Sequence, residues 1–263
     1  MRAATGLAAL ALLTCVAGTG AAASNPPDPI PLRWAGPLAK DFAALPRVTA
    51  DTPQARAVNA ALDGYDAFAR ADRSDCLAYA ETNDNIRWSR EIAVPMTGPR
   101  FLTVVITKDS YCGGAHGDWR SIPLTFDLET GGLIDWSEWL PDGLTEPRYE
   151  AAGLWPQMLR SQKLQTWYAG RALASMDDFA RETCAETLAD TEQSELLFWL
   201  DAKGGGLGMR AEGFAYARSG CGVPVVMPVD ELERLGAKPE LVQILRTATR
   251  DRLWRDHPDP AGG

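Results

Sequence analysis

Residues 87–128 read RWSREIAVPMTGPRFLTVVITKDSYCGGAHGDWRSIPLTFDL, and this stretch decides the fold. Residues 87–94 and 101–107 are rich in β-branched and aromatic side chains, and the Gly-Pro dipeptide at 98–99 is a turn signal between them. Residues 121–128 form a third run of this kind, which the sequence ETGG at 129–132 ends. The stretch therefore predicts three consecutive strands.

The residues on either side of this stretch alternate between helical and strand patterns. Thr52 and Pro53 have the residue types of a helix N-cap and first turn, and apolar side chains follow at helical spacing as far as residue 71. Further patterns predict helices over 148–162, 170–189, 230–235 and 238–254, and strands over 195–201, 207–216 and 223–227.

The order of these elements is helix, strands, helices, strands, helix, which is not the alternation of a parallel sheet. We therefore expect an α+β fold, mainly an antiparallel sheet with flanking helices, in two small subdomains. The predicted divisions are a signal peptide over 1–23, a proline-rich linker over 24–52, subdomains over 53–145 and 146–235, and a C-terminal helix and tail over 236–263.

The first residues have the pattern of a secretory signal peptide. Arg2 precedes the apolar run GLAALALLTCV at 6–16, and the small residues at 21–23 predict cleavage between Ala23 and Ser24. Cys15 allows an alternative, a lipoprotein, although the Thr14 before it fits that processing poorly. Cleavage leaves 240 residues and removes one arginine, so the net charge becomes −10, and we expect a periplasmic or secreted protein.

Composition excludes several classes of function. The chain has 263 residues, 46% of them hydrophobic and 23% charged, as folded globular proteins do. Its 35 acidic residues outnumber 26 basic ones, which disfavours binding to nucleic acid or to an anionic membrane. No later stretch predicts a membrane span. Only His116 and His257 are present, which disfavours zinc sites and catalytic triads, so we predict no metal and no cofactor.

Four cysteines remain once Cys15 is set aside, and an even number in an oxidising compartment favours two disulfides. Three pairings are open. We favour Cys76–Cys112 with Cys184–Cys221, because each bond then joins neighbours within one half of the chain. The spacings are far from those of redox or zinc motifs, so a structural role is the simplest interpretation.

The most specific motif is YCGGAHG at 111–117, and TFDLETG follows it at 125–131. Together they resemble the extracytoplasmic domain family of the anti-sigma factor RsiV and of the non-catalytic region of the peptidoglycan deacetylase PdaC. Weaker matches lie at 58–59, 197–200 and 222–228, so the resemblance covers about 53–235. The motif residues that we single out for binding or for loop structure are Tyr111, Gly113, Gly114, Ala115, His116 and Gly117.

The resemblance implies an envelope domain that binds a partner. RsiV-like domains bind lysozyme, and the PdaC domain accompanies a catalytic domain that acts on cell-wall glycan. Control of a sigma factor does not carry over, because the membrane helix and the cytoplasmic region of RsiV have no counterpart in this sequence. Lysozyme and peptidoglycan fragments are the partners that the resemblance suggests, without assigning any interface residue. The oligomeric state is left open.

His116 has two interpretations. Its imidazole either pins a glycine-rich turn by hydrogen bonds to carbonyl groups, or acts as an acid–base group, because its ordinary pKa lies near neutrality. We favour the first, since the sequence shows no set of catalytic partners. The alternative function is an envelope hydrolase that uses His116 with a nearby carboxylate.

Trp136 and Trp139 are candidates for ligand contact, because tryptophan stacks on sugars and anchors protein interfaces. At this spacing they also fit the buried side of a helical turn, which we favour. The sequence as a whole therefore predicts a secreted, non-catalytic envelope binding module. Its acidity would steer it toward basic proteins such as lysozymes. A purely structural or chaperone-like periplasmic role is a third interpretation.

Overall fold

The computed structural model of the chain shows an α+β fold, as the sequence predicts. It describes residues 28–79, 85–144, 146–147, 157–190, 195–256 and 258. The predicted signal peptide and His257 lie outside these residues. Within the described part of the chain, no helix combines the length and the apolar character that a membrane span requires.

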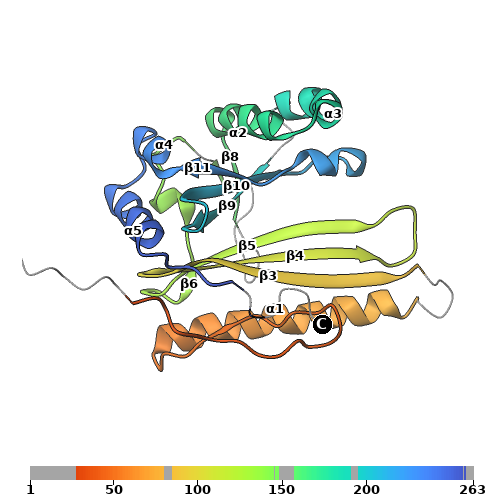
Figure 1. The fold of residues 1–263 in the computed structure, drawn as a ribbon, viewed down its shortest axis with the longest axis horizontal. Coiled ribbons are helices and arrows are strands. Elements are labelled where there is room, and N and C mark those ends of the chain that lie inside the picture. The colour runs from red at the N-terminus through yellow and green to blue at the C-terminus, as the bar shows by residue number, and fades with distance from the viewer. Residues whose placement is uncertain are drawn as a thin grey trace, which may run out of the picture.

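The first half of the chain forms a four-stranded antiparallel sheet in the order β3-β4-β5-β6. Its strands are β3 (Arg87–Thr97), β4 (Phe101–Tyr111), β5 (Asp118–Asp127) and β6 (Gly132–Leu133). The long helix α1 (Pro53–Leu77) covers one face of this sheet (Figure 1). The three predicted strands are therefore present, each longer than its sequence pattern.

Strand β4 is buried on both faces, which explains why its sequence is a continuous apolar run. Successive side chains of a strand point to opposite faces. Leu102, Val104 and Ile106 pack in the core beneath α1. Phe101 belongs instead to the main core on the other side of the sheet. The four-stranded sheet is thus the middle layer of the molecule (Figure 1).

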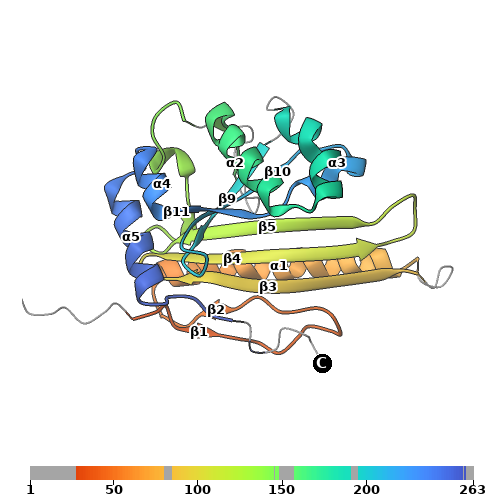
Figure 2. The same cartoon turned by 45° about the horizontal axis from the view of Figure 1, so that its top comes forward.

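The second half forms an antiparallel sheet in the order β11-β10-β9-β8-β7, and β9 contacts strands β3, β4 and β5. Figure 2 shows the second half lying across the face of the first sheet that α1 leaves open. Its strands are β7 (Glu146–Pro147), β8 (Met158–Arg160), β9 (Glu195–Asp201), β10 (Gly206–Glu212) and β11 (Val225–Pro228). The other elements are η2 (Trp136–Glu138), α2 (Gln162–Ser175), α3 (Asp178–Ala189), η3 (Tyr216–Cys221), α4 (Val229–Arg234) and α5 (Pro239–Arg250).

Two helix predictions need correction. The predicted helix over 148–162 is wrong at residues 158–160, because these residues form strand β8, in which Met158 and Leu159 pair with β9. A three-residue strand is too short to show an alternating hydrophobic pattern in the sequence, so it is recognised only from its pairing with a neighbouring strand. The predicted helix over 170–189 is interrupted at Asp177, whose carboxylate accepts the Ala180 amide and caps a new helix.

The predicted linker over 24–52 also needs correction for its described part, residues 28–52. Strands β1 (Leu32–Arg33) and β2 (Arg47–Val48) pair with one another, and Leu45 is completely buried beneath α1. Prolines prevent a regular pattern in this segment, but the apolar residues between them still pack. The predicted limits of the two subdomains stay predictions.

Candidate functional site

The motif at 111–117 forms the tip of the hairpin between β4 and β5. The strands stay in register from Phe101–Asp127 to Ser110–Asp118, so the tip lies at the far end of the longest strands. Gly113 and Gly114 have φ angles of 80° and 142°, in the region that glycine adopts easily. The motif therefore forms a tight loop at the end of the β4–β5 hairpin (Figure 1).

Side chains of the loop bond to its own backbone. The Tyr111 hydroxyl donates to the Gly114 carbonyl oxygen at 2.9 Å. His116 Nδ1 lies 3.0 Å from the carbonyl oxygen of Gly117, which is a hydrogen bond when that nitrogen carries the proton. No carboxylate of the described residues forms an ion pair with His116. These are the contacts that the structural interpretation of His116 describes, and a binding role for the loop stays a prediction.

The ring of His116 stacks on Tyr216, the first residue of η3 in the second half of the chain. The ring centroids are 3.5 Å apart and the planes meet at 18°. Tyr216 is 53% exposed, and Trp119, on the β5 side of the hairpin tip, is 46% exposed. Three ring side chains from two distant segments are therefore accessible in one region, and we call His116, Trp119 and Tyr216 the tip surface.

A buried arginine lies beneath Trp119. The Arg210 guanidinium of β10 is 4.0 Å from the centre of the Trp119 ring, and its Nη1 is 3.0 Å from a Glu212 carboxylate oxygen. Its Nε donates to the Gly222 carbonyl oxygen. Cation–π attraction to Arg210 therefore holds Trp119 against the second sheet.

Two carboxyl groups of this region have pKa values shifted in opposite directions. Burial raises the pKa of Glu212, and the Arg210 guanidinium acts against this rise. Burial also acts to raise the pKa of Asp118, but hydrogen bonds and charges from Arg120 and Lys108 outweigh it, so this pKa lies below its ordinary value. Opposed shifts are typical of acid–base pairs. Here each carboxylate is already ion-paired, so the shifts follow from structural contacts.

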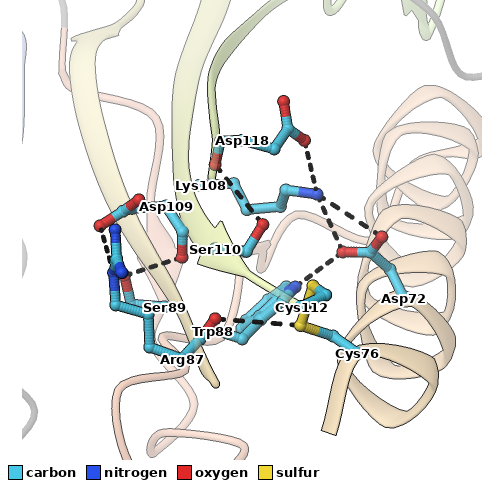
Figure 3. Close-up of a disulfide and its surroundings, with 10 residues drawn as sticks. All are labelled: Asp72, Cys76, Arg87, Trp88, Ser89, Lys108, Asp109, Ser110, Cys112 and Asp118. Atoms are coloured by element: carbon cyan, nitrogen blue, oxygen red, sulfur yellow. Dashed lines mark hydrogen bonds and ion pairs between the residues drawn. A yellow bond between two sulfur atoms is a disulfide. The ribbon is translucent and has the colours of Figure 1, made fainter. Parts of the chain in front are cut away.

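A disulfide anchors the root of the hairpin tip to α1 (Figure 3). Cys112 directly follows strand β4 and bonds to Cys76, with Cα atoms 4.7 Å apart. Beside it, Lys108 lies between Asp72 of α1 and Asp118 of β5, 3.1 Å from an oxygen of each carboxylate. The hairpin is therefore cross-linked to the helix at the start of the motif.

The second disulfide anchors the other side of the tip surface. Cys221, the last residue of η3, bonds to Cys184 of α3, with Cα atoms 5.4 Å apart. Both predicted pairings are thus present. His116 lies four residues after one bridge and Tyr216 lies five before the other, so two cross-linked segments present the stacked rings. This preorganisation lowers the entropic cost of binding a partner.

Trp136 and Trp139 do not belong to this surface. They are only 3% and 4% exposed, and they lie on a short 3-10 turn in the main core. Trp136 packs edge-on against Phe198, and Trp139 against Phe101. Of the two interpretations, the structure therefore shows core packing, and the ligand-contact interpretation has no exposed ring to support it.

The sequence did not single out Trp119, Arg210, Glu212 or Tyr216. Arg210 gave a signal, because it is a lone positive charge inside the apolar strand GLGMRAE and so requires a buried partner. Tyr216 gave none, since only the tertiary fold brings it to His116. Within the described residues, no group of three or more His, Cys, Asp or Glu side chains is placed to hold a metal ion.

Comparisons with known proteins give a distant structural match. No protein-family model matches the chain, and no curated protein matches it. Among solved structures, the chain is similar to a member of the DUF3298 family from Bacteroides fragilis. The two are 18% identical, with a TM-score of 0.41, over 76% of this chain and 75% of that one. Membership of the RsiV-like family, which the motif at 111–117 suggests, stays a prediction.

Proposed function

We propose that the protein is a non-catalytic binding module of the cell envelope, which binds a lysozyme-like protein or peptidoglycan glycan through the tip surface. The observation that carries the proposal is the stack of His116 on Tyr216 beside the exposed Trp119. Exposed aromatic rings on rigid supports are the usual anchors of protein interfaces and of sugar stacking.

The disulfides and the charge support the same proposal. Two structural disulfides fit a protein that works outside the cytoplasm, where thiols are oxidised. The formal net charge of −9 favours encounter with basic proteins, and lysozymes are commonly basic. The geometry of His116, hydrogen-bonded to a carbonyl and stacked on a ring, supports a positioning role for its imidazole rather than acid–base chemistry.

The proposal is tested by calorimetric titration of the disulfide-bonded protein with lysozyme and, separately, with soluble muropeptides. We expect Tyr216→Ala or Trp119→Ala to weaken binding by about 2 kcal/mol, which is roughly 30-fold, because each removes an exposed aromatic anchor. Phe179→Ala is the matched control, since Phe179 is an exposed aromatic residue on α3, outside the tip surface.

Three outcomes would contradict the proposal. The first is no binding to either ligand by the folded protein. The second is an equal loss of affinity in Phe179→Ala. The third is hydrolysis of cell-wall substrate that His116→Ala abolishes without loss of folding, which would favour the hydrolase alternative instead.

A further inference from the structure

A cavity lies on the opposite side of the first sheet from the tip surface, against the C-terminal half of α1. It has a volume of about 330 Å³. The helix contributes Arg70, Arg73, Ser74 and Leu77, which are spaced i, i+3, i+4 and i+7 and therefore form one stripe. Two arginines of this stripe thus line the same small cavity.

The opposite wall is apolar and held in place. It consists of Leu38, Ala39 and Phe42, from the segment that precedes β2. The amide of Ala43 donates to the Arg90 carbonyl of β3 at 3.1 Å, and the Arg90 guanidinium lies 4.5 Å from the centre of the Phe42 ring. Backbone and side-chain contacts therefore fix this wall to the sheet, so the cavity is part of the fold.

Neither cavity arginine is neutralised within the described part of the chain. Arg70 and Arg73 form no ion pair or hydrogen bond there, and the Nε of Arg73 is buried without an acceptor. The carboxylates nearby are already engaged, because Asp66 binds Arg90 and Arg47, and Asp72 binds Lys108.

Two further acidic residues lie close in sequence and do not change this conclusion. Asp41 and Asp75 are exposed, and neither lines the cavity. The positive charge at the cavity also affects the pKa of the neighbouring Arg90. Burial is the main cause that lowers the pKa of Arg90, and the charges of Arg70 and Arg47 lower it further. Among the described residues, the cavity is therefore a cationic site within an acidic protein.

We propose that this cavity binds an organic anion, a carboxylate joined to a small apolar group. The forked N–H groups of a guanidinium match the two oxygens of a carboxylate, and two arginines one helical turn apart can share one anion. The walls of Leu38, Ala39, Phe42 and Leu77 receive the apolar part. An inorganic ion would leave these walls uncovered.

The experiment titrates the disulfide-bonded protein with N-acetyl-alanyl-alanine and with octanoate, which represent a peptide terminus and a fatty acid. The C-terminal amide of the dipeptide and inorganic phosphate are the comparison probes. We expect at least one carboxylate to bind, and Arg73→Gln to weaken it by about tenfold or more. The control Arg33→Gln removes the same charge from an exposed arginine outside the cavity and should leave affinity unchanged.

A second variant distinguishes a loss of binding from a loss of folding. Ser74 is exposed and lines the cavity, so Ser74→Phe should fill the cavity and abolish binding without a loss of thermal stability. Failure of both carboxylates to bind the folded protein would overturn the proposal. So would binding of the neutral amide as tight as that of the acid, or an equal loss of affinity in Arg33→Gln. The tip surface is separate, so Tyr216→Ala should leave this binding unchanged, and the two proposals can fail independently.

Discussion

Each half of the molecule contains one disulfide that closes a loop of nearly the same length, yet the two bonds lie in different surroundings. The sequence separations are 36 and 37 residues. Cys184 and Cys221 both lie in the main apolar core. Cys76 lies in a small cluster with Phe42, Ala69 and Trp88, and its partner Cys112 is only half-buried.

The polar contacts of the two halves differ in the same way. The first half buries the carboxylate of Asp66 between two arginines and joins α1 to the sheet through Lys108. The second half relies on a larger apolar core, in which Arg210 is a rare buried charge. Because the two loops have similar lengths, each disulfide should contribute a similar amount to stability through the entropy of the unfolded chain. The packing around each disulfide differs, so the two halves depend on different interactions.

The largest expected effect is loss of the second disulfide. Replacing Cys184 and Cys221 by alanine should cost about 4 kcal/mol through the entropy of the unfolded chain and about 1 kcal/mol more for lost contacts of buried sulfur. Replacing Cys76 and Cys112 should cost about 4 kcal/mol only, since the loop is equally long and one sulfur is near the surface. Urea unfolding of both double variants measures the difference, and a larger loss for the Cys76–Cys112 pair than for the Cys184–Cys221 pair would break the comparison.

The next effect is removal of the buried carboxylate in the first half. Asp66→Ala should destabilise the protein by about 3 kcal/mol, because it leaves the buried Arg90 guanidinium without its counter-charge. We expect the lower end of the usual range, since Arg47 can turn toward water. Asp63→Ala is the control, because this carboxylate also pairs with Arg47 but is 70% exposed. Denaturant unfolding should show less than about 1 kcal/mol for it, and equal losses would contradict the expectation.

The smallest effect is a pH dependence that separates Asp118 from Glu212. The lowered pKa of Asp118 contributes stability above its ordinary value of 3.8, and that stability is lost as the pH falls. The raised pKa of Glu212 has the opposite sign, so its contribution is present in acid and is lost as the pH rises above the ordinary value of 4.5.

The measurement is the unfolding free energy from about pH 2 to pH 7. Asp118→Asn should cost less than about 1 kcal/mol near neutrality, because the side chain is partly exposed, and nothing at the acid end. Glu212→Gln should instead gain stability relative to the natural protein as the pH rises. Parallel curves for the two variants would show that the two carboxyl groups do not differ in this way.

The sequence predicted the local features because each depends on near neighbours. Thr52 caps α1, as its residue type and the following Pro53 indicate, and the three strands of residues 87–128 lie where the apolar runs are. The disulfide pairing could also be predicted, since each bond joins cysteines within one half of the chain. The end of α1 at Leu77 and the break at Asp177 were missed, because capping competes with a weak helical period.

The candidate site was predicted only in part. The glycine-rich loop was located, and Gly113 and Gly114 adopt the positive φ angles that the motif suggests. Tyr216, one hundred residues away, could not be placed beside His116 from any local pattern. For Trp136 and Trp139 the sequence allowed two positions, because their spacing fits both an exposed surface and a buried core. Only the packing of η2 against the second sheet places them in the core.

The sequence by itself determined the α+β class, the hairpin that presents the motif and the favoured pairing of the four cysteines. Periodicity, turn residues and cysteine spacing are properties of short segments, so they can be read before the chain is folded. The tertiary structure decided that the described part of the proline-rich segment packs beneath α1, that His116 meets Tyr216, and that Arg70 and Arg73 face an apolar wall. Each of these depends on which distant segments lie side by side, and that follows from burial of the whole core rather than from any one stretch.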